Sequence, residues 1–293
     1  MIKTSTYTFA DLDTEAICKK NYPGLITIKD KVNWVPIEEI IDKAYTVGKQ
    51  PNGRAAYAGI LLFRMCILEI MFKHSDREIV QQCNANVCYR FFLGVGLADS
   101  IPSYSRMSIF RDYIIESGAA EQVLDELVRQ FISLGLIDES KLVVDSSFTE
   151  SAANPSSKRR HAVDPDAAVA KKNNEYHFGY KIHIITDGKG MVLGYVSTPA
   201  NTTDTEMLQS VIDRTGLKGG ILLTDRGYSS LHNRNIIKFR GMKDGIMRLT
   251  YKNQSEEIKN DIKSCNNSLQ KMRYVVERTF GGFVLWFKGK RSR

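Results

Sequence analysis

Apolar positions at helical spacing fill the first half of the chain. Residues 54–73 are apolar on nearly every side and predict a buried helix, too short and too charged to span a membrane. Shorter helices are indicated at 36–44, where isoleucines recur at helical spacing, and at 120–134, where an apolar residue returns every three or four positions. Between them, Ser75-Asp76-Arg77-Glu78 has the pattern of a capping box, and the Ser-rich turn at 102–105 begins another helix. We therefore expect an all-helical domain at 1–136.

After Gly135 the pattern changes to short apolar runs separated by turns. Residues 149–175 are polar and predict a long, mobile loop. Asp187-Gly188 marks a hairpin, and Thr203 to Glu206 form a second capping box in which Asp204 is expected to cap its helix. The predicted strands are 141–144, 179–186, 191–198, 221–224 and 246–249, and the predicted helices are 203–216, 231–239 and 256–280. This order predicts an α/β domain at 137–293, with a mixed sheet flanked by helices.

Composition and charge favour a nucleic-acid partner. The 293 residues leave room for two domains, and 41 Lys and Arg against 33 Asp and Glu give a net charge of +8. Such an excess suits a polyanion, although many proteins are mildly basic for no specific reason. The five cysteines are scattered, without the close pairs of a zinc site, which fits reduced thiols. With no membrane-length apolar run and no signal-peptide pattern at the start, a cytoplasmic protein is expected.

Two aspartates are the first candidates for chemistry. Asp145 and Asp225 each follow a short apolar strand, and if those strands are neighbours the carboxylates converge at one sheet edge. Clustered carboxylates repel each other, and a divalent cation such as Mg²⁺ or Mn²⁺ relieves that repulsion. The alternative for Asp225 is a residue that shapes the turn. His177 and His183, six apart on one strand, are interpreted as polar surface and not as metal ligands.

A third carboxylate is normally needed to complete such a metal site, and Glu277 is the best candidate. It shares a helical face with Arg273, so the glutamate could reach a metal while the arginine holds a phosphate. The alternative is an ion pair facing solvent. Lys181 and Arg226 are candidate phosphate contacts beside the site, or solvated charges.

Taken together, these motifs resemble the bacterial insertion-sequence transposases of the DDE class, in the group named for insertion sequences five and four. The helical front half, with Ser75 to Glu78 and Tyr89 to Gly94, is similar to the N-terminal domain of the same proteins. The resemblance covers about residues 50 to 288. Its motifs are the segments 145–147, 164–167, 178–181, 198–201, 224–228 and 273–281, which occur in the family's order.

The resemblance implies an RNase H-like catalytic domain and a helical DNA-binding domain. It places the acidic triad, as catalytic residues and metal ligands, on Asp145, Asp225 and Glu277. It further implies Mg²⁺ in a two-metal mechanism, cleavage of double-stranded DNA at the element's terminal inverted repeats by water, and joining of the freed 3′-hydroxyl to target DNA. The active form is expected to be a homodimer. The expected DNA contacts are Arg273, Lys181, Arg226 and Lys288.

The chain departs from the family's Tyr-x2-Arg-x3-Glu-x6-Lys signature at both ends. Gln270 stands at the Tyr position and Val284 at the Lys position, with Lys288 or Lys290 as substitutes. Relatives also continue further past the glutamate. The alternative functional hypothesis is therefore a decayed or truncated transposase that only binds element-end DNA. A standalone RNase H-like nuclease or resolvase is a third hypothesis, which the helical front half disfavours.

Overall fold

The computed structural model describes residues 13–48, 56–151, 164–172, 174–287 and 291–292. These residues form two compact units, Met1–Gln130 and Phe131–Arg293. The division falls inside a helix, a few residues before the boundary expected at 136. The roles assigned to the two domains stay predictions. Among the described residues, no helix combines the length and hydropathy needed to cross a membrane.

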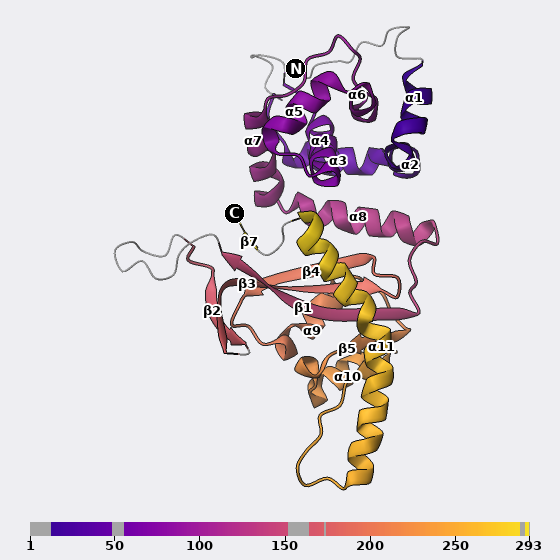
Figure 1. Ribbon diagram of the computed structural model, residues 1–293, viewed down its shortest axis with the longest axis vertical. Helices are drawn as coiled ribbons and strands as arrows, with labels where there is room; N and C mark the ends of the chain where they lie inside the picture. Colours follow the sequence, from indigo (N-terminus) through magenta and orange to yellow (C-terminus); the bar gives the residue numbers. More distant parts are fainter. Residues whose placement is uncertain (1–12, 49–55, 152–163, 173, 288–290, 293) are drawn as a thin grey trace, which may run out of the picture. The chain divides into compact units, whose positions relative to one another are not determined.

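The first unit is all-helical, as its apolar spacing predicted. Two short helices precede the one expected at 36–44; their charged sequences carry few apolar residues, so the pattern did not reveal them. Ser75 and Glu78 form the predicted capping box, with Ser75 N donating to Glu78 Oε2 at 2.7 Å. The helices are α1 (Thr14–Asn21), α2 (Pro23–Lys31), α3 (Trp34–Ala44), α4 (Gly59–Phe72), α5 (Asp76–Ala85), α6 (Val87–Leu93), α7 (Tyr104–Glu116) and α8 (Ala119–Ser133) (Figure 1).

The core of this unit forms around α4, the most apolar helix. Its Leu62, Met65 and Leu68 are fully buried, as the all-round apolar pattern predicted. They belong to one hydrophobic cluster with side chains from α3, α6 and α7. Buried side chains of α2, α5 and α8 also belong to this cluster, so the unit has a core of its own.

The second unit is built on one mixed sheet. The strands are β1 (Lys141–Ser151), β2 (Ala168–Lys172), β3 (Glu175–Asp187), β4 (Val192–Pro199), β5 (Ile221–Thr224), β6 (Lys243–Ile246) and β7 (Arg291–Ser292). Their order is β2-β3-β1-β5-β6, with β4 also paired to β3 and β7 to β1. β1 runs antiparallel to β3 and parallel to β5, which runs parallel to β6. The mixed α/β fold behind a helical unit is therefore confirmed.

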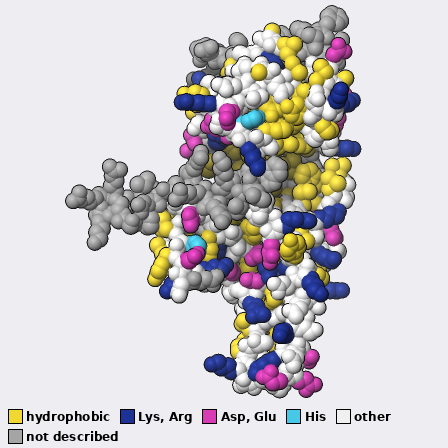
Figure 2. All heavy atoms as spheres, viewed as in Figure 1, with side chains coloured by type: hydrophobic (Ala, Val, Ile, Leu, Met, Phe, Trp, Pro, Cys, Tyr) yellow, Lys and Arg dark blue, Asp and Glu magenta, His cyan; other side chains and the backbone are white. Residues whose placement is uncertain are grey.

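Helices α9 (Asp204–Asp213), α10 (Leu231–Phe239) and α11 (Glu256–Phe287) accompany this sheet, with a 3-10 turn at Arg226–Tyr228. Figure 1 shows α11 lying across the sheet, with its first turns extending past the strands. Val276 of α11 is fully buried in a cluster with Val143, Ile184 and Leu223. Many of the Lys and Arg side chains visible on this unit lie along α11 (Figure 2).

Several predicted boundaries were wrong. β1 does not end at Val144 but continues to Ser151, because its backbone stays paired with β3 whatever its side chains. The predicted loop at 149–175 therefore holds the end of β1 and all of β2, and its segment 152–163 lies outside the described residues. The last predicted strand, 246–249, lies at Lys243–Ile246, and the last helix continues to Phe287.

The predicted hairpin joins β3 to β4, and Asp187 shapes its turn. Asp187 is fully buried, and its Oδ1 accepts hydrogen bonds from the backbone N–H groups of Lys189 and Met191 at 2.9 and 2.8 Å. Its Oδ2 accepts the N–H of Asp138 at 2.9 Å. A carboxylate that accepts backbone N–H groups from both sides fixes the turn and the entry into β1.

Candidate active site

Asp145 of β1 and Asp225, which directly follows β5, belong to neighbouring segments of the sheet. The parallel pairing of β1 with β5 aligns Leu142 with Leu222 and Val143 with Leu223, the last pair of this ladder. Asp145 and Asp225 each come two residues after that pair, where β5 has ended. Adjacent strands lie about 4.8 Å apart, which brings the two residues close together. The two strands are therefore neighbours, as the predicted convergence required, but Asp145 lies within β1 and not at its end.

The Asp145 carboxylate is largely withdrawn from water and held by two donors. Arg273 Nη2 donates to Oδ2 at 2.9 Å, and the N–H of Ser146 donates to Oδ1 at 2.9 Å. Burial raises the pKa of Asp145 to about 6; the Arg273 guanidinium opposes the rise, while the charges of Asp225 and Asp204 add to it. Asp145 therefore sits within electrostatic reach of two further carboxylates.

Asp225 both shapes a turn and faces the site. Its Oδ1 accepts the N–H of Gly227 at 2.8 Å and caps the 3-10 turn. A Cβ atom on Gly227 would lie 3.0 Å from Asp225 Oδ1 and 3.1 Å from Asp204 Oδ2. Glycine at this position therefore leaves room for two carboxylates that approach it from either side.

Asp204 belongs to this site and was missed as a functional residue. Thr203 makes no side-chain cap hydrogen bond, so the predicted capping box is absent. Asp204 is instead the first residue of α9, and its Oδ1 accepts the Ser146 hydroxyl at 2.9 Å and lies 3.1 Å from Lys181 Nζ. The available sequence signal was an acidic residue shortly after the end of a strand in the same sheet, like Asp225.

Behind Asp204 lies a buried histidine. His183 is fully buried, with Nδ1 3.1 Å from the Tyr228 hydroxyl and Nε2 3.3 Å from Thr198 Oγ1. The prediction of polar surface at His183 was therefore wrong. Burial lowers its pKa to about 4, which leaves the ring neutral. Burial also raises the pKa of Tyr228 well above its ordinary value, and the nearby Asp204 and Asp145 charges add to the rise.

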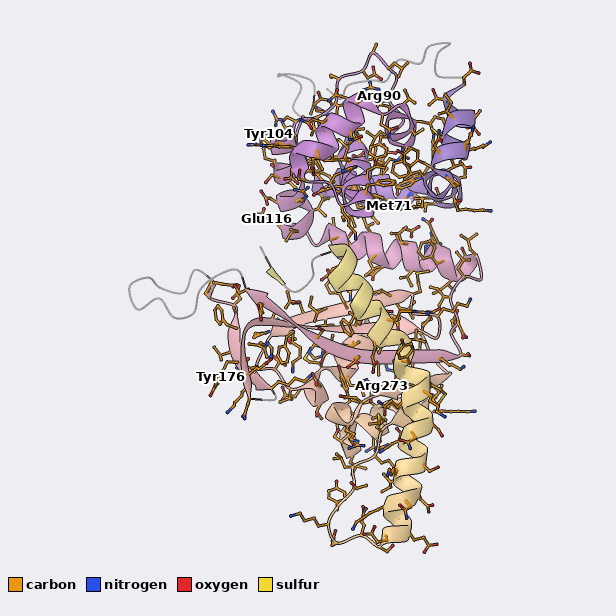
Figure 3. The ribbon with its side chains drawn as sticks, viewed as in Figure 1. Met71, Arg90, Tyr104, Glu116, Tyr176 and Arg273 are labelled. Carbon is orange, nitrogen blue, oxygen red and sulfur yellow. The ribbon has the colours of Figure 1, made fainter. Side chains whose placement is uncertain are left out.

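The other predicted site residues have different environments. Arg273 is 6% exposed and engaged with Asp145, whereas Glu277, one turn further along α11, faces solvent. Figure 3 shows Arg273 where α11 crosses the sheet. Lys181 is buried, and its ammonium group donates to Thr202 O at 2.8 Å. Arg226 is exposed beside Asp225, and Lys288 lies outside the described residues.

The site has the oxygen donors that a hard divalent cation prefers. Asp145 and Asp225 supply carboxylates whose mutual repulsion a cation would relieve. The Arg273 guanidinium already compensates part of the negative charge of Asp145. Across the described part of the chain, however, no three His, Cys, Asp or Glu side chains lie close enough together to hold a metal. The donor chemistry therefore fits Mg²⁺ or Mn²⁺, while Glu277 is not assembled with the two aspartates.

Comparison with known families agrees with this geometry. Residues 132–292 match the family described as the transposase DDE domain. The chain belongs to the DDE transposase family. Residues 15–113 of this transposase also match a second family, described as a transposase domain (DUF772). It is 32% identical over 202 residues to the transposase for insertion sequence element IS1106 of Neisseria meningitidis serogroup B, covering 62% of this chain and 68% of that relative.

Solved transposase structures show more distant likeness. The piggyBac transposase in a synaptic complex with hairpin DNA is 13% identical, with a TM-score of 0.39, covering 83% of this chain and 55% of that one. The Mos1 mariner paired-end complex with Mn is 12% identical, with a TM-score of 0.24, covering 97% and 92%. Both TM-scores are low, and these likenesses say nothing about the site.

Proposed function

We propose that this transposase binds the terminal inverted repeats of its own element, cleaves DNA strands there by hydrolysis, and joins the freed 3′-hydroxyl to target DNA. The family match and the insertion-sequence relative support a DNA-cleaving enzyme with double-stranded DNA as its partner. The helical unit would hold the element ends. Two copies of the chain would act together, one for each end.

The observation that supports the proposal is the parallel pairing of β1 with β5, which ends two residues before Asp145 and Asp225. These two residues would hold Mg²⁺ or Mn²⁺, which when bound activates the attacking oxygen and stabilises the leaving one. Arg273 keeps the Asp145 carboxylate in one orientation through its 2.9 Å hydrogen bond. The turn at Gly227 does the same for Asp225. Two acidic ligands, one within β1 and one at the turn after β5, would therefore be held in place before DNA arrives.

Glu277 is proposed as the third acidic residue, on the strength of its place in the family signature. It lies on the same helix as Arg273 and faces solvent, so it is accessible to DNA and to metal. Because the described residues hold no three-carboxylate group, Glu277 would complete the site when DNA binds. Exposed Arg226, next to Asp225, is proposed as a contact to a DNA phosphate.

The test is a nicking assay on duplex DNA that carries the element's ends, with Mg²⁺ or Mn²⁺. Asp145→Asn, Asp225→Asn and Glu277→Gln should each abolish nicking and leave binding of the duplex intact. Glu257→Gln makes the same change at another exposed position of α11 and should nick like the wild type. A Glu277→Gln variant with full activity would remove Glu277 from the triad.

The same assay separates the remaining functional hypotheses. A wild-type chain that binds element ends but nicks them with neither metal would be a decayed transposase, which the family matches do not favour. Cleavage with no preference for element ends would indicate a general nuclease.

A further inference from the structure

An open groove of about 480 Å³ adjoins the carboxylate site. One end of the groove is formed by Ser146 and Asp204, which are hydrogen-bonded to each other beside Asp145. From there it extends along β1 and β3 to β2. Its lining includes Ser146, Phe148, Lys171, Lys172, Lys181 and Asp204. Of these, Asp204 alone belongs to the carboxylate site.

One aromatic residue, Phe148, lies in the lining of this groove, where β1 and β3 run side by side. Phe148 pairs with Lys181 in the sheet register. The ring of Phe148 stacks on the ring of His177, with centroids 4.6 Å apart and planes 7° apart. Both residues are half-buried, so part of each side chain is exposed to solvent. A stacked pair of rings beside a polar groove offers a site for another flat ring.

The groove also carries an excess of positive charge. Lys181 is paired with Asp204, at 3.1 Å. Lys171 and Lys172 are exposed, and in the part of the chain that the structure describes neither has a carboxylate within salt-bridge distance. Lys172 Nζ lies 5.7 Å from the centroid of Phe148. Lys171 Nζ instead lies 5.3 Å from the centroid of Tyr176, its partner in the sheet, on the face opposite to that of His177 and Phe148. Figure 3 shows Tyr176 on the outer strands of the sheet.

We propose that this groove binds an unpaired DNA strand next to the cleavage site, with a phosphate at Lys172 and a base against the Phe148–His177 pair. Basic grooves with aromatic rings are how proteins hold single strands. In a duplex the faces of the bases are covered by their neighbours, so only an unpaired strand can use the rings. The inference rests on the proposed function, because the site supplies such a strand when it cleaves an end.

The experiment measures binding of a fluorescein-labelled single-stranded oligonucleotide to the full chain by anisotropy, in EDTA, over a range of salt concentrations. Lys172→Ala should lower the slope of log affinity against log salt by about 0.7, the contribution of one phosphate contact on a single strand. His177→Ala should weaken binding about tenfold without changing that slope. Lys218→Ala removes one exposed charge away from the groove and should match the wild type.

Two results would overturn the groove assignment. One is a Lys172→Ala variant whose single-strand affinity and salt slope equal those of the Lys218→Ala control. The other is an equal loss of affinity for unbroken duplex, which would indicate a general electrostatic effect. Because binding is measured without metal, the outcome is independent of cleavage. If the wild type nicks element ends but the groove variant binds single strands normally, the groove assignment fails and the proposed function stands. If the groove binds single strands but the wild type does not nick, the groove assignment stands and the proposed function fails.

Discussion

Arg273 and Asp145, 128 residues apart in the chain, meet through a hydrogen bond of 2.9 Å from Nη2 to Oδ2. Both side chains are largely buried, at 8% and 19% exposed. The arginine therefore acts as the counter-charge of a desolvated carboxylate, and a phosphate contact for Arg273 would require that bond to open. This pair ties α11 to the strand that carries the first acidic residue of the site.

Arg273→Met should lower the free energy of unfolding by about 3 kcal/mol, because it leaves a buried carboxylate without its partner. Urea denaturation measures this loss. In the Asp145→Asn background the same substitution should have a much smaller effect, since no charge is left to compensate. Equal losses in the two backgrounds would mean that Arg273 stabilises α11 through packing alone.

The proximity of Asp145 and Asp225 could be predicted because its signal is local, although Asp145 lies within β1 and not at a strand end. An apolar run followed by Asp indicates a buried strand and then a polar position. The parallel pairing of β1 with β5 is what brings the two aspartates together. The environments of Arg273 and Glu277 could not be predicted in this way. Their spacing gives the same helical face, but only packing against Val143 and Leu223 decides which side chain is buried.

Asp204 and His183 show a second limit of the sequence. A polar residue at the start of a helix suggests a cap, and a histidine on a strand suggests surface, because those are the common cases. Their actual partners, Lys181 and Ser146 for Asp204 and Tyr228 for His183, come from other elements. Tertiary hydrogen bonds between distant residues leave no periodic trace in the chain.

Gly227→Ala should impair the site with little effect on the fold. Its methyl group would lie 3.0 Å from Asp225 Oδ1 and 3.1 Å from Asp204 Oδ2, so one carboxylate must move. We expect a fall of about 10- to 100-fold in the rate of end nicking, typical of small displacements of catalytic groups. Gly281→Ala, where a Cβ would meet nothing within 4 Å, is the control and should nick at the wild-type rate.

Asn266→Ala should loosen α11 from the end of the sheet. Asn266 is 3% exposed, accepts the N–H of Arg248 at 2.8 Å and donates to the carbonyl oxygen of Arg248 at 2.9 Å. Loss of both bonds is expected to lower the free energy of unfolding by about 2 kcal/mol in urea denaturation. Asn267→Ala, at the exposed neighbouring position, should not lower stability, because alanine favours a helix more than asparagine does. If Asn266→Ala also lowered stability no more than Asn267→Ala, the Arg248 contact would not stabilise the protein.

His183 should make the stability of the protein depend on pH. Its pKa falls from 6.5 to about 4 on burial, so the unfolded chain binds a proton between these values that the folded chain does not. The stability contributed by the neutral ring is fully present above pH 6.5 and is lost as the pH falls toward 4. At pH 4 this loss of unfolding free energy reaches about 3 kcal/mol. His183→Gln keeps a neutral polar side chain beside Tyr228 and Thr198 but cannot take up that proton. On acidification the wild type should therefore lose more unfolding free energy than His183→Gln, as measured by urea denaturation at several pH values. His232→Gln, at an exposed position, is the control measured in parallel. A difference that stays constant with pH would mean that the His183 ring titrates in the folded protein as it does in the unfolded chain.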